Sequence, residues 1–87
     1  MTSNLSKPVV TIYTRPRCHL CEEAKQSMCD AQCADEYTLN EVNIEGDPDL
    51  LKRYRYDVPV ISINGVETFK HRVTPEDFRT AILHHSP

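Results

Sequence analysis

The stretch TIYTRPRCHLCEEAK, residues 11–25, places two cysteines two positions apart between a strand-like run and a helix-like run. Residues 9–14 are all β-branched or aromatic, which favours a strand buried on both faces; Pro16 then ends this strand because proline has no backbone donor. Beyond it, apolar residues recur every three or four positions and predict an amphipathic helix. That apolar face contains Leu20, Cys21, Ala24, Met28 and Ala31. Cys18 therefore falls where the helix begins.

The length of 87 residues fits one small domain over residues 1–87, with an ordered core over about residues 9–83. A formal charge of −3 and the absence of a one-sided basic stripe argue against nucleic acid as a partner. No apolar run approaches the roughly 18 residues that span a bilayer, and residues 1–8 lack the apolar centre of a secretory signal. We therefore expect an intracellular monomer, cytoplasmic or mitochondrial, without a membrane partner.

The rest of the chain predicts the order strand, helix, strand, helix, strand, strand, helix. The later elements are expected at residues 36–44 (strand), 48–54 (helix), 58–69 (two strands) and from 75 (helix). Asn64-Gly65 predicts a tight hairpin turn, while Asp47 and Thr74 are placed as helix N-caps. Strands joined through a helix are parallel, and hairpin strands are antiparallel. We predict an α/β fold with a four-stranded mixed sheet and helices on both faces.

The spacing of Cys18 and Cys21 is used by metal sites, structural crosslinks and redox dithiols. Unpaired N–H groups and the helix dipole favour a thiolate at Cys18, and Arg15 and Arg17 add positive charge. In a redox scheme Cys18 attacks a target disulfide, and Cys21 then displaces the product and closes a Cys18–Cys21 disulfide. His19 either tunes this pair or faces solvent. Two ordinary buried cysteines are the structural alternative.

Cys29 and Cys33 do not fit a shared metal site with the first two cysteines. A rise of about 1.5 Å per residue places Cys29 roughly 16 Å along the helix from Cys18, whereas zinc ligands lie about 2.3 Å from the ion. If both lie in one regular helix, the two later cysteines cannot bridge, because their Cβ atoms are about 5 to 6 Å apart. A disulfide-stapled secreted scaffold is also disfavoured, because the cysteines crowd into residues 18–33. We expect two free, partly buried thiols and no metal.

With this strand, the Cys-x-x-Cys helix start, Val58-Pro59 before a hairpin and a closing helix, the chain resembles the thioredoxin-fold superfamily, and glutaredoxins most closely. The likeness spans about residues 9–83. TIYTRPRCHLCEEAK and DPDLLKRYRYDVPVISING look like the small glutaredoxin-like proteins. This resemblance implies a thiol–disulfide oxidoreductase without a bound cofactor. Its partner would be a disulfide-containing protein or glutathione, the latter as a co-substrate.

The resemblance also implies a substrate-binding groove beside the dithiol. In this family the Val58-Pro59 bond is cis, and Val58 offers its backbone to an incoming peptide or glutathione. Arg15 occupies the position of a lysine that attracts the glutathione carboxylate. We place Arg17 and His19 in the same groove, together with Pro59, which keeps a backbone donor away from the sulfurs.

Two features depart from the glutaredoxin pattern. The Gly-Gly that follows the fourth strand in glutaredoxins is absent from FKHRVT, residues 69–74, so the resemblance does not carry glutathione binding to this region. The motif CHLC replaces the usual proline- and tyrosine-containing dithiol, so the sequence does not fix the redox potential. Two alternatives stay open: a redox-inactive thioredoxin-fold module that binds a protein, and a dimer that shares an iron–sulfur cluster through Cys18.

Overall fold

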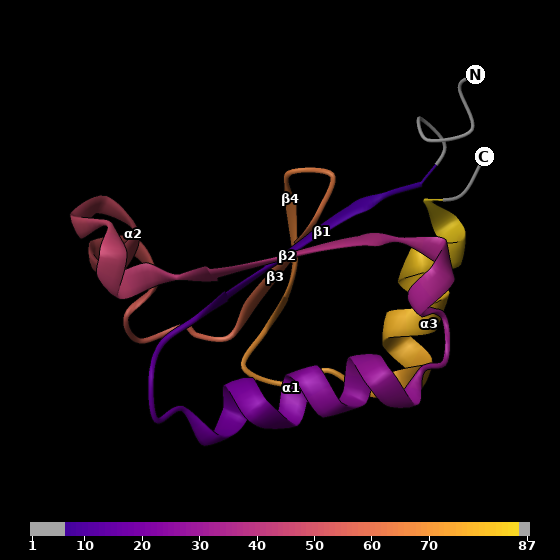
Figure 1. The fold of residues 1–87 in the computed structure, drawn as a ribbon, viewed down its shortest axis with the longest axis horizontal. Coiled ribbons are helices and arrows are strands. Elements are labelled where there is room, and N and C mark those ends of the chain that lie inside the picture. The colour runs from indigo at the N-terminus through magenta and orange to yellow at the C-terminus, as the bar shows by residue number, and fades with distance from the viewer. Residues whose placement is uncertain (1–6, 86–87) are drawn as a thin grey trace.

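The computed structural model describes residues 7–85, which form one four-stranded sheet with three α-helices (Figure 1). In chain order the elements are β1 (Val9–Thr14), α1 (His19–Asp30), the 3₁₀ turn η2 (Ala34–Glu36), β2 (Thr38–Asn43), the 3₁₀ turn η3 (Ile44–Gly46), α2 (Pro48–Tyr54), β3 (Val60–Ile63), β4 (Val66–Lys70) and α3 (Pro75–His84). The strand order is β2-β1-β3-β4, with β1 and β2 parallel and the other pairs antiparallel. The predicted α/β fold with a mixed sheet is confirmed.

In Figure 1, α1 and α3 lie on one face of the sheet and α2 lies on the opposite face. Val10 and Ile12 of β1 are completely buried in the larger core beneath α1 and α3. On the opposite face Tyr13 stacks on Tyr54 of α2, with ring centres 4.8 Å apart. Val9 remains 40% exposed. The prediction that the first strand is buried on both faces is therefore wrong, because the short α2 covers only the Tyr13 end of β1.

Two hydrophobic clusters stabilise the fold, and burial of each large apolar side chain contributes about 1.5 to 3 kcal/mol. The larger one joins β1 and β3 to α1 and α3, and its members are Val10, Ile12, Ala24, Met28, Ala31, Cys33, Ile61, Ile63, Phe78 and Ile82. The smaller one contains Cys21, Ile44, Tyr54, Val58 and Val60. The smaller cluster places α2 and the start of β3 against the Cys-x-x-Cys motif. Leu20, predicted on the apolar face of α1, is only partly buried.

Local sequence signals set most boundaries of these elements. Asn64 and Gly65 have positive φ angles of 53° and 86°, which the predicted tight hairpin turn requires. The Thr74 hydroxyl accepts a hydrogen bond from the Asp77 N–H at 3.0 Å and caps α3 as predicted. The second strand is shorter than the predicted 36–44, because the two 3₁₀ turns take both of its ends. The ordered core was predicted to end at about residue 83; α3 extends to His84, and residues 86–87 lie outside the described part of the chain.

The end of α1 differs from the prediction for Cys33. The helix stops at Asp30, and the chain turns at Gln32, whose φ is 57°. Arg79 of α3 donates from Nε (2.8 Å) and from Nη2 to the Ala31 carbonyl and so satisfies this helix end. Cys33 therefore lies outside the helix, and the helix-based argument against a bridge does not apply to it. None of the helices within residues 7–85 is long and apolar enough to cross a membrane.

Candidate active site

Cys18 is the N-cap residue of α1. The loop after β1 carries Pro16 and Arg17, whose φ is 59°, and brings Cys18 to the helix start in an extended conformation. The Cys18 Sγ accepts a hydrogen bond from the Cys21 N–H at 3.1 Å. Unpaired N–H groups and the positive end of the helix dipole stabilise negative charge at this position. The predicted location of Cys18 at the start of α1 is confirmed.

Cys21 lies beneath Cys18 and is only 1% exposed. It packs into the smaller cluster between α1 and α2, whereas Cys18 is partly exposed at the surface. The two Cα atoms are 5.2 Å apart, within the range that a disulfide requires, and the two sulfurs are paired as a disulfide. The pair therefore presents one sulfur to the outside and keeps the other in the core.

A groove of about 520 Å³ opens beside Cys18. Its lining residues come from the loop before α1, from η3 and from the α2–β3 loop: Arg15, Pro16, Arg17, Cys18, Glu45, Arg55 and Val58. The structure thus gathers Arg15, Arg17 and Val58 around Cys18. His19 is exposed and lines an adjoining hollow, which it shares with Arg17, Cys18 and Glu22. Pro59 follows the groove residue Val58 and is itself buried, so it does not line the groove.

The Val58-Pro59 peptide bond is cis, as the family resemblance implied. The Val58 N–H donates to the Tyr54 carbonyl at 3.1 Å, and the Pro59 carbonyl accepts from the His71 N–H at 2.8 Å. The resemblance implied that the Val58 backbone pairs with a substrate, and its N–H group is engaged inside the protein in this state. Pairing through that group requires the Tyr54 carbonyl to be displaced.

Arg15 connects the loop before α1 to the opposite wall of the groove. Its Nη2 lies 3.5 Å from a Glu45 carboxylate oxygen, and its Nη1 donates to the Arg55 carbonyl at 3.2 Å. Sequence reasoning missed Glu45 and Arg55 as groove residues, because their approach to Cys18 depends on how α2 packs against the sheet. The signal was the basic run KRYR, residues 52–55, which stands shortly before the Val58-Pro59 pair.

The segment between β4 and α3 occupies the place of the glutaredoxin Gly-Gly. His71 has a φ of 66°, a left-handed conformation that glycine adopts at lower cost. The Arg72 guanidinium lies 3.4 Å from a Glu23 carboxylate oxygen, which joins this segment to α1. These side chains line a cavity of about 270 Å³ with Ser27, Thr74 and Asp77. This segment therefore carries His71 and Arg72, which are larger and more polar than the two glycines of the glutaredoxin pattern.

Cys29 and Cys33 do not join this site. Both are free thiols near the far end of α1, Cys29 exposed and Cys33 buried. The prediction that both are partly buried is therefore wrong: Cys29 is more exposed than expected, and Cys33 is more buried. Burial raises the pKa of the Cys33 thiol, and Glu36 raises it further. Within residues 7–85 no three His, Cys, Asp or Glu side chains gather in a group that would hold a metal ion.

Comparison with known proteins agrees with this geometry. Residues 9–83 match the family model described as "Glutaredoxin-like domain (DUF836)". The "Glutaredoxin-like protein YDR286C homolog" of Dictyostelium discoideum is 31% identical over 77 residues, which cover 82% of this chain and 71% of that protein.

Solved structures give the same fold. XcR50 from X. campestris has a TM-score of 0.74 at 26% identity and covers 90% of this chain and 99% of its own. Ne2328 from Nitrosomonas europaea has a TM-score of 0.74 at 25% identity, with 94% and 99% coverage. Oxidised mitochondrial thioredoxin 3 from Saccharomyces cerevisiae, at 14% identity and TM-score 0.64, shares the fold over 93% of this chain and 81% of its own. The chain belongs to the glutaredoxin-like family and has a thioredoxin-like fold.

Proposed function

We propose that this protein is a thiol–disulfide oxidoreductase of glutaredoxin type, in which Cys18 is the nucleophile and Cys21 the resolving thiol. One observation carries the proposal: the Cys18 sulfur caps α1, accepts a hydrogen bond from the Cys21 N–H at 3.1 Å and lies beside a groove. The buried Cys21 lies one turn further along the helix. A sulfur in that position is stabilised as a thiolate, the form that attacks disulfides.

The reaction proceeds by two exchanges. In the reduced protein the Cys18 thiolate attacks one sulfur of a target disulfide; a mixed disulfide forms and the other target sulfur leaves as a thiolate, which takes up a proton. Cys21 then loses its proton to solvent and attacks Cys18. The mixed disulfide breaks, the second target thiolate leaves, and the Cys18–Cys21 disulfide forms. The target gains two electrons and the protein loses two.

Turnover requires an external thiol that reduces the Cys18–Cys21 disulfide. A dithiol protein or two molecules of glutathione supply the two electrons and emerge as a disulfide. Glutathione is thus a proposed co-substrate and not a bound cofactor. The midpoint potential of the Cys18–Cys21 pair in a glutathione buffer decides whether the protein acts as a reductant or an oxidant in a given compartment.

A single-turnover reaction with a small neutral disulfide, bis(2-hydroxyethyl) disulfide, tests the proposal. We expect the reduced wild type to form the Cys18–Cys21 disulfide, Cys18→Ser to lose the reaction, and Cys21→Ala to accumulate the mixed disulfide, each followed by mass spectrometry. Cys29→Ser is the control, because that thiol lies at the other end of α1. Equal rates for wild type and Cys18→Ser, or no reaction in the wild type, would rule the function out and favour a redox-inactive binding module.

A further inference from the structure

The groove beside Cys18 is positively charged although the whole chain is negative. Arg15, Arg17 and Arg55 line it, against one carboxylate, that of Glu45. The Arg15–Glu45 pair at 3.5 Å offsets one of these charges. No carboxylate within residues 7–85 forms an ion pair with Arg17 or Arg55. Two guanidinium groups that have no carboxylate partner among these residues therefore line the groove next to the Cys18 sulfur.

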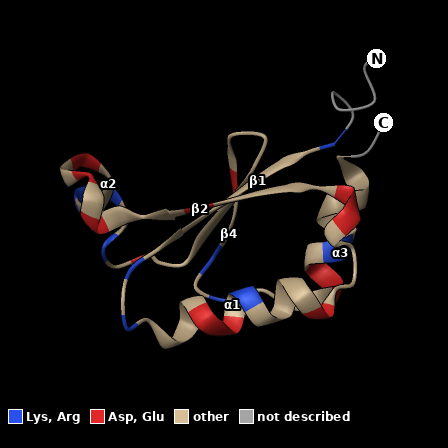
Figure 2. Cartoon of the chain, viewed as in Figure 1, with Lys and Arg blue, Asp and Glu red and all other residues tan. Residues whose placement is uncertain are grey.

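The carboxylates next to the groove form ion pairs with lysines and not with Arg17 or Arg55. The Lys25 ammonium group lies 3.1 Å from both the Glu22 and the Glu41 carboxylate, and that of Lys70 lies 3.8 Å from Asp57 and 3.9 Å from Glu67, so two carboxylates share each lysine. Figure 2 shows basic positions both on the loop that leads into α1 and beside α2. A cleft in which one sign of charge predominates raises the local concentration of ligands of the opposite sign.

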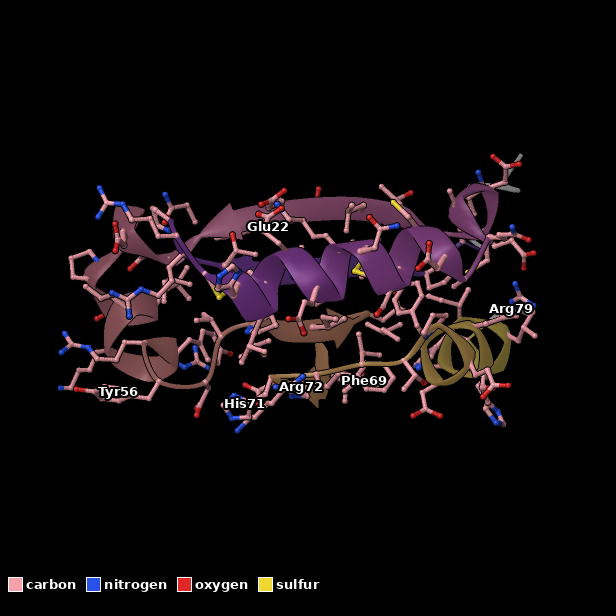
Figure 3. The ribbon with its side chains drawn as sticks, turned by 90° about the horizontal axis from the view of Figure 1, so that it is seen from below. Glu22, Tyr56, Phe69, His71, Arg72 and Arg79 are labelled. Atoms are coloured by element: carbon pink, nitrogen blue, oxygen red, sulfur yellow. A yellow bond between two sulfur atoms is a disulfide. The ribbon has the colours of Figure 1, made fainter. Side chains whose placement is uncertain are left out.

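The α2–β3 loop extends this surface beyond the groove. Tyr56 is 82% exposed, and the Arg55 guanidinium carbon lies 5.7 Å from the centre of its ring. Figure 3 shows Tyr56 at the α2 end of the molecule, away from α1. Exposed tyrosine and arginine side chains are enriched where proteins contact other proteins. An aromatic contact outside the groove favours a ligand that continues past the disulfide on this side.

We propose, on the basis of the oxidoreductase function above, that the preferred substrate is a disulfide in a polypeptide whose flanking residues are acidic. Arg17 and Arg55 select the carboxylates, and Tyr56 contacts the chain beyond them. The chemical step is the exchange already described: Cys18 attacks the polypeptide sulfur, the second polypeptide sulfur leaves as a thiolate, and Cys21 completes the transfer of two electrons. The carboxylates bind and do not react.

Three peptides that differ only in the residues flanking one intramolecular disulfide test this inference: aspartate, asparagine or lysine. The readout is the single-turnover rate with each peptide, divided by the rate with bis(2-hydroxyethyl) disulfide, so that general changes in Cys18 reactivity cancel. We expect the aspartate peptide to react on the order of tenfold faster than the asparagine peptide at low salt, and the lysine peptide to react more slowly than both. The preference should shrink with added salt.

Matched variants locate the selectivity. Arg17→Gln with Arg55→Gln should bring the aspartate-to-asparagine ratio close to one, while Arg17→Lys with Arg55→Lys should retain most of it. Lys52→Gln removes an exposed cation on α2 that does not line the groove and should leave the ratio unchanged. Tyr56→Ala should slow the aspartate peptide relative to the small disulfide.

The outcomes separate this inference from the function on which it rests. Equal rates for the aspartate and asparagine peptides, or an aspartate preference that survives the double glutamine variant, would overturn the inference. Oxidised glutathione also carries carboxylates, and a faster relative rate for it than for the aspartate peptide would overturn the assignment to a polypeptide. Failure of the small neutral disulfide to react would instead overturn the oxidoreductase function.

Discussion

Cys29 and Cys33 have the same functional group but different surroundings. Cys29 is exposed on the last turn of α1, whereas Cys33 is 4% exposed in the larger core. The pKa of Cys33 is raised, first because burial penalises the thiolate and then because of Glu36, with Arg79 acting in the opposite direction. Since the thiolate is the reactive form, both accessibility and protonation protect Cys33.

Alkylation of the oxidised protein with a maleimide tests this difference. With Cys18 and Cys21 paired, we expect one fast addition at Cys29 and a second at Cys33 on the order of 100-fold slower, because the second requires local opening of the core. Mass spectrometry of peptides identifies each site over time. Cys29→Ala should leave only the slow addition, and denaturant should make both fast. A fast addition at Cys33 in the native protein would contradict the burial described here.

At the same scale, individual site residues were predictable where the chemistry is local. Cys18 and Cys21 follow from the helix start and its period, and both lie where the sequence placed them. Arg55 was not predictable, because its position beside Cys18 depends on the packing of α2. The burial of Pro59 next to Val58 was not predictable either, because local sequence does not distinguish a residue that lines a groove from a buried neighbour.

At the scale of elements, α2 is the helix that completes the groove. Its seven residues are too few for an isolated helix to be stable in water, so it depends on its cap and on packing. The Asp47 carboxylate accepts hydrogen bonds from the N–H groups of Asp49 (2.9 Å) and Leu50 (3.4 Å). Tyr54, at the other end of α2, is buried in the smaller cluster with Cys21.

Asp47→Ala should therefore lower the free energy of unfolding by about 1 kcal/mol, since two N–H groups lose their acceptor. Urea unfolding followed by circular dichroism measures this change. Asp47→Asn keeps a side-chain oxygen and should retain most of the stability. If the alanine and asparagine variants are equally destabilised, the negative charge and not the cap stabilises this end of α2.

The elements themselves were largely predictable from local signals. Pro48 after Asp47, and Asn64 with Gly65, mark boundaries that the structure reproduces. The end of α1 was not predictable in the same way, because the Ala31 carbonyl is satisfied by Arg79, which lies 48 residues further along the chain. The limits of β2 were also missed, since its flanking 3₁₀ turns carry no strong sequence signal.

At the scale of the whole molecule, one thiol and two tyrosine hydroxyls, all buried or partly buried, link the stability of the fold to alkaline pH. Burial is the first cause that raises the pKa of Cys33, Tyr37 and Tyr54, and the hydrogen bond from the Tyr54 hydroxyl to Glu67 at 2.7 Å adds to it. A raised pKa in the folded state means that the protonated form is favoured there. This stability is complete below the ordinary values of 9.0 for the thiol and 10.0 for tyrosine, and it is lost as pH rises through the higher folded values.

The urea midpoint should therefore be level near neutral pH and fall as the pH rises past about 9. Tyr54→Phe should lose about 1 kcal/mol at neutral pH, because the hydroxyl bond to Glu67 is gone, but its stability should fall less steeply above pH 10. The exposed Tyr56, as Tyr56→Phe, is the matched control and should keep the wild-type slope. An unchanged slope in Tyr54→Phe would show that this hydroxyl does not contribute to the alkaline loss.

The composition gives the net charge of the molecule but not how the charges are distributed over its surface. The formal charge of −3 argued only against a nucleic-acid partner, and it averages a basic groove with acidic positions elsewhere on the surface. Which charges pair and which remain free depends on contacts between segments far apart in the chain, such as Arg15 with Glu45 and Arg72 with Glu23. Those contacts exist only once the sheet has brought the segments together.

Tyr54 belongs to the same hydrophobic cluster as the buried Cys21, and the ring of Tyr13 packs against that cluster and contacts the ring of Tyr54. Because the chain has no tryptophan, these two of its four tyrosines contribute strongly to the near-ultraviolet spectrum. We expect reduction of the disulfide to change the surroundings of that ring pair. Near-ultraviolet circular dichroism of the oxidised and reduced protein should therefore follow the oxidation state of the Cys18–Cys21 pair without a dye or engineered label.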